Sequence, residues 1–126
     1  MHAVTMLFVS DVEATSAWYQ SVLGVVSGHG GDEFDMLLAG DNVIMQLHKI
    51  DDDHHDHSVN LEGPLGHGVV VVVYVDSAQV AVDQAKAQGA EIISDLEWNE
   101  VAHMHEFTMR DLNGYSVMVC EAEWAK

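Results

Sequence analysis

The stretch VSDVEATSAWYQSVLG, residues 9–24, decides the fold, because residues 75–89, VDSAQVAVDQAKAQG, repeat its plan. Each stretch has an aspartate just after an apolar run and a glycine 13 residues beyond that aspartate. The helical spacing of the apolar residues in between predicts an amphipathic helix in both cases. One plan used twice within 126 residues is typical of a tandem duplication of one structural unit.

The residues around the two stretches complete two similar sets of elements. Each helix follows a strand-like apolar run and precedes two or three more such runs. The expected strands lie at 4–9, 25–27, 34–38 and 43–48 in the first half, and at 69–75, 91–96, 101–109 and 115–121 in the second. The continuously apolar run 69–75 also predicts a strand that is buried on both faces.

Single residues mark the ends of these elements. Ser10, with a glutamate three residues on, predicts a capping box at the first helix, and Gly24 predicts its end. Asp76, with a glutamine three residues on, predicts the start of the second helix. Segment 111–114 ends in Asn-Gly, a strong signal for a β-hairpin turn.

The order strand-helix-strand-strand-strand, used twice, predicts an α+β fold. We expect two tandem βαβββ modules that form a curved mixed sheet around a cleft. Module 1–49 and module 67–126 make up a single domain, and an acidic, His-rich linker at 50–66 joins them. The cleft is the expected place for a ligand.

The composition excludes several classes of function. Four Lys and Arg stand against 21 Asp and Glu, and the net charge of −17 argues against nucleic acid and anionic membranes as partners. The charge favours a cationic ligand if the acids line the cleft, although a solvated acidic surface is the simpler interpretation. The single cysteine, Cys120, excludes an internal disulfide, and no apolar run is long enough to span a bilayer. The first residues lack the basic start of a signal peptide, so we expect a cytoplasmic protein.

Several short segments, taken in their order and spacing, carry a resemblance to a known family. They are residues 4–11, 18–19 and 23–24 in the first half, and 73–76, 88–90 and 110–115 in the second. The arrangement resembles the vicinal oxygen chelate superfamily, which includes glyoxalase I, fosfomycin resistance enzymes, extradiol dioxygenases and bleomycin resistance proteins. In the last segment, Leu112 stands where this family usually has proline.

The resemblance implies a divalent metal, held by His or Gln on the first strand of each half and by Glu or Gln on the last. The matching positions are Val4, Gln46, Val70 (Val69 by the strict repeat offset) and Met118. Only Gln46 has a donor atom, and a divalent ion needs about four to six ligands. The resemblance therefore points to the bleomycin resistance branch, which sequesters a drug without chemistry. It implies a homodimer with no metal and no cofactor.

Strand alternation predicts which side chains share the face of that dismantled site. The expected ligand-binding residues, apolar with a few polar groups, are Phe8, Gln46, His48, Tyr74, Met104, Glu106, Thr108 and Met118. An inward-facing Glu106 would pair with a cation or act as a base, which makes it the candidate catalytic residue, and an exposed rim carboxylate is the even alternative. The simpler interpretation of His48 is a surface histidine.

The sequence leaves an enzymatic alternative open. A glyoxalase-like lyase or isomerase, or a dioxygenase, could use a divalent metal relocated to His2, Gln46, His48 or His67, and a metal-free isomerase could use Glu106. The His103-x-His105 spacing on an expected strand could also bind zinc, nickel or copper on the face away from the cleft. We favour a protein that binds a small organic molecule, apolar or aromatic and cationic, without catalysis.

Overall fold

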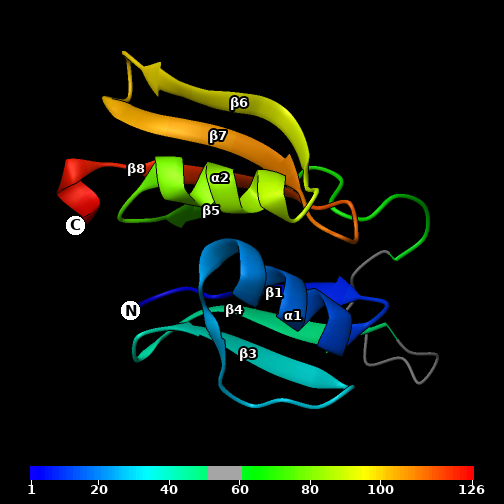
Figure 1. Ribbon diagram of the computed structural model, residues 1–126. Coiled ribbons are helices and arrows are strands. Elements are labelled where there is room, and N and C mark those ends of the chain that lie inside the picture. The colour runs from blue at the N-terminus through cyan, green and yellow to red at the C-terminus, as the bar shows by residue number, and fades with distance from the viewer. Residues whose placement is uncertain (51–60) are drawn as a thin grey trace. The chain divides into compact units, whose positions relative to one another are not determined.

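The computed structural model describes residues 1–50 and 61–126, and it divides into two compact units, Met1–Leu65 and Gly66–Lys126. The boundary between the units falls inside the expected linker 50–66, of which residues 51–60 lie outside the described residues. The units are called module 1 and module 2 and are taken one at a time (Figure 1).

Module 1 is a four-stranded mixed sheet with a helix on one face (Figure 1). Its elements are β1 (Thr5–Val9), α1 (Val12–Leu23), β2 (Val26–Ser27), β3 (Phe34–Ala39) and β4 (Asn42–Lys49). The strand order is β1-β4-β3-β2, with β1 parallel to β4 and the other pairs antiparallel. Helix α1 connects β1 to β2, and the two hairpins β2-β3 and β3-β4 then bring the chain back beside β1.

Module 2 repeats this topology. Its elements are β5 (Val70–Tyr74), α2 (Ala78–Ala87), β6 (Glu91–Asn99), β7 (Met104–Arg110), β8 (Ser116–Glu121) and a short 3₁₀ helix, η1 (Glu123–Ala125). The strand order is β5-β8-β7-β6, again with one parallel pair, β5 with β8. The predicted α+β fold of two βαβββ modules is confirmed, and the expected strands differ from the observed ones only near their ends.

Alternation along the strands decides which face of each sheet packs against the helix. In module 1, this helix-side face carries the buried side chains Leu7, Val9, Asp35, Leu37, Met45 and Leu47. In module 2, it carries the buried side chains Val71, Phe107, Met109, Val117 and Val119. The opposite face of each sheet is called its distal face.

The two helices begin one residue later than the sequence predicts. The N-cap of α1 is Asp11, not Ser10, and its carboxylate accepts the amide hydrogen three residues on at 2.9 Å. The N-cap of α2 is Ser77, not Asp76, and its hydroxyl accepts the corresponding amide hydrogen at 3.2 Å. The predicted stop of α1 at Gly24 is confirmed, since this residue caps the helix with a left-handed φ of 71°.

The core of module 1 contains a buried carboxylate, Asp35, which is 2% exposed. It accepts hydrogen bonds from the Ser16 hydroxyl (2.6 Å), the Ser27 hydroxyl (2.8 Å), and the amides of His29 (3.2 Å), Gly30 (2.7 Å) and Met36 (2.8 Å). Burial raises the pKa of Asp35, but the hydrogen bonds outweigh it and hold the pKa below its ordinary value of 3.8. Asp35 thus ties the loop after β2 to both α1 and β3.

Strand β5 is buried on one face only, so the prediction of burial on both faces is wrong for this chain. Val71 on the helix side is 5% exposed, whereas Val70, Val72 and Tyr74 on the distal face are 54%, 42% and 45% exposed. Because β5 also lies at the edge of its sheet, a row of apolar side chains remains uncovered there.

The end of module 2 differs from the prediction in one detail. Strand β7 begins at Met104, so His103 lies in the preceding turn and not on the strand. The hairpin turn at 111–114 is confirmed: the Asp111 carboxylate accepts the amide hydrogens of Asn113 at 2.8 Å and Tyr115 at 3.0 Å.

Candidate ligand-binding faces

In module 1, the distal face brings three of the predicted site residues together. Phe8 on β1 lies beside His48 on β4, and His48 lies beside Phe34 on β3, so the three form one row across the sheet. The rings of Phe8 and His48 are 5.0 Å apart between centroids. Gln46 lies in the next row, between Met6 and Met36.

In module 2, the distal face holds the other five predicted residues. Tyr74 on β5 lies beside Cys120 on β8, and Cys120 lies beside Glu106 on β7. We call this series of three residues the Tyr74–Glu106 row. The next row contains Met118 and Thr108, and Met104 packs on the same face against Cys120.

Glu106 is half-buried within this apolar and sulfur-rich setting. Its Oε1 accepts a hydrogen bond from the Asn99 side-chain amide at 3.1 Å. Glu106 lies beside Cys120 in the strand register, and burial together with the nearby charge of Glu106 raises the pKa of the Cys120 thiol. Glu106 is thus less exposed than Glu97, its neighbour on β6, although both side chains lie on the distal face.

An aromatic residue that the sequence analysis missed stands at the end of the same row. Trp124, from η1, packs against Tyr74 with 4.8 Å between ring centroids and 62° between ring planes. Trp124 is 70% exposed. The available signal was the alternation of Met118, Cys120 and Ala122, which leads the chain along the distal face toward the tryptophan.

The eight predicted residues therefore form two groups, one on the distal face of each sheet. That the two groups line one common cleft stays a prediction. The roles of these residues in ligand binding, and of Glu106 in catalysis, stay predictions as well.

The metal positions implied by the resemblance do not offer a suitable set of ligands. Val70 pairs with Ser116 and Met118 pairs with Val72 on the distal face of module 2, and these side chains carry no suitable donor except the Ser116 hydroxyl. In module 1, Gln46 has only the Met6 and Met36 side chains beside it in its row. Within residues 1–50 and 61–126, no group of three or more His, Cys, Asp or Glu could hold a metal ion. The residues present therefore do not fit the family metal.

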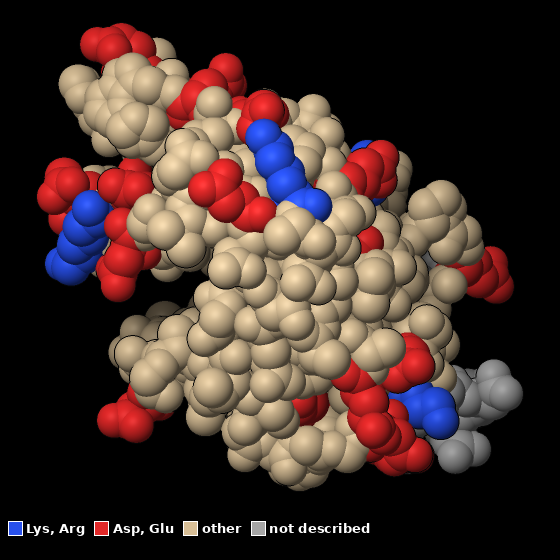
Figure 2. Space-filling view, in the orientation of Figure 1, with Lys and Arg blue, Asp and Glu red and all other residues tan. Residues whose placement is uncertain are grey.

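The surface charge is predominantly negative. Figure 2 shows acidic side chains scattered over the visible face, with the few basic side chains lying beside them. Lys86 contacts Asp95 at 3.1 Å, and Lys126 contacts both Glu121 at 3.2 Å and Glu123 at 3.1 Å. Exposed pairs of this kind add little stability, but a net charge of −17 creates a field that attracts cations.

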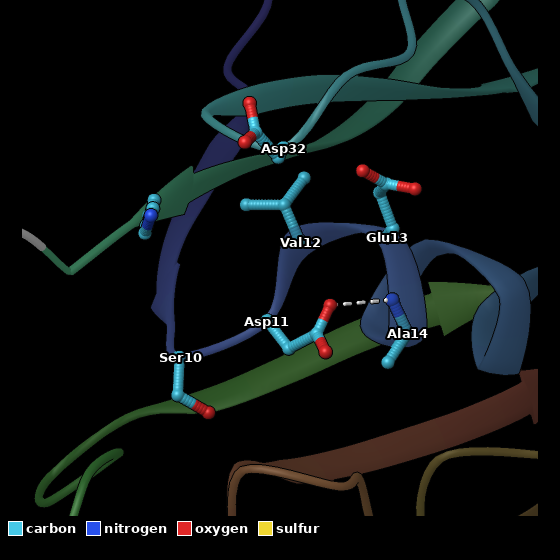
Figure 3. Close-up of a pocket in the computed structure, with 7 residues that line it drawn as sticks. Ser10, Asp11, Val12, Glu13, Ala14 and Asp32 are labelled. Carbon is cyan, nitrogen blue, oxygen red and sulfur yellow. Dashed lines mark hydrogen bonds between the residues drawn. The ribbon is translucent and has the colours of Figure 1, made fainter.

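A polar hollow of about 450 Å³ lies at the start of α1 in module 1 (Figure 3). Its lining residues are Ser10, Asp11, Val12, Glu13, Ala14, Asp32 and Lys49. The Asp11 carboxylate is already engaged with the Ala14 amide, as the dashed line in Figure 3 marks. The hollow therefore lies at the start of the helix and shares no residue with the distal faces.

In the part of the chain that is described, no helix has the length and apolar character needed to cross a membrane. The cytoplasmic location stays a prediction.

Solved structures with the same fold are numerous, and three of them are similar to this chain at 14–21% sequence identity. TioX from Micromonospora sp. ML1 is 21% identical, with 96% of this chain and 98% of that chain covered and a TM-score of 0.73. An integron cassette protein from the mobile metagenome of V. cholerae is 20% identical, with 98% and 96% covered and a TM-score of 0.75. A glyoxalase-related enzyme from Fulvimarina pelagi is 14% identical, with 97% and 88% covered and a TM-score of 0.76.

These likenesses establish the fold alone. A comparison with curated protein sequences gave no significant match. In contrast, the sequence model of one protein family matches residues 2–119, which is nearly the whole chain. The chain therefore belongs to the Glyoxalase/Bleomycin resistance protein/Dioxygenase superfamily.

Proposed function

We propose that this protein binds and sequesters a small organic molecule without the metal typical of its superfamily. The molecule is apolar or aromatic and carries positive charge. The Tyr74–Glu106 row is the observation that carries this proposal, because it sets a half-buried carboxylate among aromatic and sulfur-containing side chains. Such a mixture of apolar surface with a few polar groups is typical of small-molecule sites.

The chemistry of the row favours a cation. The Glu106 carboxylate has one hydrogen bond, from Asn99, and this leaves acceptor capacity for a ligand. Tyr74 and Trp124 present exposed rings at the other end of the row, and aromatic faces attract cations. Methionine side chains such as Met118 adapt to irregular apolar ligands.

The test is a thermal-shift screen of cationic aromatic compounds against matched neutral and anionic analogues, followed by titration of the best hit. Glu106→Gln should weaken binding of a cationic hit by about ten-fold or more, because the ligand charge would then be buried without its partner. Added salt should weaken binding only slightly, since a desolvated pair is poorly screened.

Glu97→Gln is the matched control, because it removes the same charge from the exposed neighbour of Glu106 on the same face. It should leave the affinity within about two-fold, as expected for an exposed charge. Hits that are anionic, or equal affinity of Glu106→Gln and the parent protein, would show that the assigned face or its charge is wrong.

A second candidate function is that of a glyoxalase-like lyase or isomerase, or a dioxygenase, with a relocated metal. Gln46 and His48 favour it, because they lie two residues apart on β4 and share the distal face of module 1. His2 and His67 are the other candidate ligands, and Glu106 is the candidate base of a metal-free isomerase. Elemental analysis separates the two functions: about one metal per chain that is lost in Gln46→Ala would establish the enzyme-type site.

We also propose a homodimer. Val70, Val72 and Tyr74 expose apolar surface along an edge strand, and such surfaces are usually covered by a partner. Light scattering at micromolar protein concentration should give twice the chain mass of 13.8 kDa, and Val72→Lys should shift the protein toward the monomer. A monomer mass for the parent protein would contradict the dimer.

A further inference from the structure

Two histidines and a tryptophan meet where β6 turns into β7. Trp98 on β6 pairs across the hairpin with His105 on β7, and their rings lie 4.9 Å apart between centroids. His103, in the turn just before β7, places its ring 5.9 Å from the same indole. Two imidazoles thus contact a single tryptophan within one hairpin.

The backbone at His103 is held in an uncommon conformation. Its φ of 53° makes it the only non-glycine residue with a positive φ within residues 1–50 and 61–126. Such a conformation costs free energy for a residue with a side chain, and outliers of this kind concentrate at functional sites. A glycine would adopt this backbone conformation without that cost. The chain carries an imidazole at this position instead.

Both imidazoles approach the indole from the β7 side. His103 and His105 are separated by one residue, and both rings lie edge-on to Trp98, with interplanar angles of 83° and 63°. The intervening Met104 lies on the distal face with Cys120, so His105, the next residue of β7, lies on the helix-side face, and His103 contacts the same indole from the turn. All three members of the cluster are exposed to solvent.

The acidic side chains around the cluster are already engaged by other groups. Glu100 accepts the Trp98 indole hydrogen at 2.6 Å. Glu121 pairs with His105 across β7 and β8, but its oxygens accept from the Ala78 amide at 2.9 Å and from Lys126 at 3.2 Å. These acids make the surroundings of the two histidines negative, which favours a cation, and the imidazole nitrogens of His103 and His105 are the candidate metal-binding groups.

We propose that His103 and His105 bind a late first-row transition-metal ion, Cu²⁺ most tightly, with water molecules completing the coordination. Imidazole nitrogens suit copper, nickel and zinc, and affinity for such ligands rises to a maximum at copper. The site lies at the turn between β6 and β7, and its strand member His105 is on the face opposite to Glu106, so it is separate from the positions that the superfamily metal would use. The inference does not depend on the proposed small-molecule function.

The experiment is a titration of the 126-residue chain with copper sulfate, and binding is monitored by calorimetry and by tryptophan emission. The starting protein carries His2→Asn, His54→Asn, His55→Asn and His57→Asn, which removes ligands near the N-terminus and in the polar segment. We expect about one bound Cu²⁺ per chain with quenching of Trp98, weaker binding of Ni²⁺ and Zn²⁺, and at least ten-fold weaker copper binding in His105→Ala.

His103→Gly is the sharper variant, because it removes the imidazole while it relieves the backbone strain, so loss of folding does not confuse the result. It should also weaken copper binding at least ten-fold. Trp98→Phe should keep the calorimetric binding and lose most of the quenching, and His67→Ala should change neither. Copper affinity that survives both His103→Gly and His105→Ala, or binding that leaves Trp98 emission unchanged, would overturn the proposal.

Discussion

The two modules have the same topology but build their sheets from side chains of different chemistry. Phe8, His48 and Phe34 form the distal row of module 1, and Tyr74, Cys120 and Glu106 occupy the corresponding positions of module 2. The first row is aromatic throughout, whereas the second contains a thiol and a carboxylate. A duplicated fold can therefore keep one backbone while its two faces acquire different binding chemistry.

The helix-side faces differ as strongly. Asp35 in module 1 pairs with Leu47 across the sheet, and Phe107 holds the corresponding position in module 2, beside Val119. Asp35 is satisfied by five donors, including Ser16 of α1, whereas the α2 residue in the place of Ser16 is the apolar Val82. Both solutions obey one rule: a buried position is either fully hydrogen-bonded or fully apolar.

The largest effect is expected when the chemistry of module 1 is placed in module 2. Phe107→Asp buries a carboxylate where α2 offers the apolar Val82 in the place of the Ser16 hydroxyl, so we expect a loss of about 5 kcal/mol or more, enough to prevent folding. Phe107→Leu, the control, should cost less than about 1.5 kcal/mol. Urea denaturation followed by circular dichroism measures both, and a stable Phe107→Asp protein would contradict the comparison.

The aromatic residues at corresponding positions of the distal rows should differ next. Phe8 is 4% exposed, so Phe8→Ala should lower the free energy of unfolding by about 3–5 kcal/mol. Tyr74 is 45% exposed and packs its ring against the exposed Trp124, so Tyr74→Ala should cost only about 1 kcal/mol. Equal losses in chemical denaturation would mean that the two rows serve the fold alike.

Asp35→Asn tests the polar core of module 1. We expect a loss of about 2–3 kcal/mol at neutral pH, because hydrogen bonds to a charged group are lost. The pKa of Asp35 in the folded protein lies below 3.8, so its stabilising contribution is complete well above pH 3.8 and disappears as the pH falls through the lowered pKa. The stability difference between parent and variant should therefore shrink in acid, and a difference that grew on acidification would exclude this role.

The smallest effects concern the helix caps. Asp11→Ala and Ser77→Ala should each cost about 1 kcal/mol, with Asp11→Ala the larger because its charge also favours the helix start. Asp76→Ala, the control, should change the stability by less than about 0.5 kcal/mol. Thermal unfolding measures the stability of the three variants. If Asp76→Ala lowered the stability more than Ser77→Ala, Asp76 and not Ser77 would be the N-cap of α2.

Local sequence patterns were sufficient to predict the repeat, the helices and most strands. Helical and strand periods depend on neighbouring residues, so the two βαβββ modules, the stop at Gly24 and the turn at 111–114 could be predicted from the chain alone. Alternation also predicted that Phe8, Gln46, His48, Glu106 and Met118 share the face of one cleft. The structure brings the first three together on the distal face of module 1 and the other two on that of module 2, and the common cleft stays a prediction. The predicted N-caps were one residue too early in the chain. Aspartate and serine are adjacent at each helix start, and only the backbone conformation selects between them.

Contacts between distant segments were decided by the tertiary structure. The hydrogen bond from Ser16 to Asp35 and the packing of Trp124 on Tyr74 join residues whose spacing follows no helix or strand period. The His103-x-His105 spacing was visible in the sequence, but the hairpin decides that both imidazoles contact Trp98. The exposure of β5 on one face likewise depends on which elements cover the sheet. An apolar sequence such as that of β5 fits a strand buried on one face as well as a strand buried on both. Periodicity reports how a segment is built, whereas burial and side-chain partners depend on what the rest of the chain brings to it.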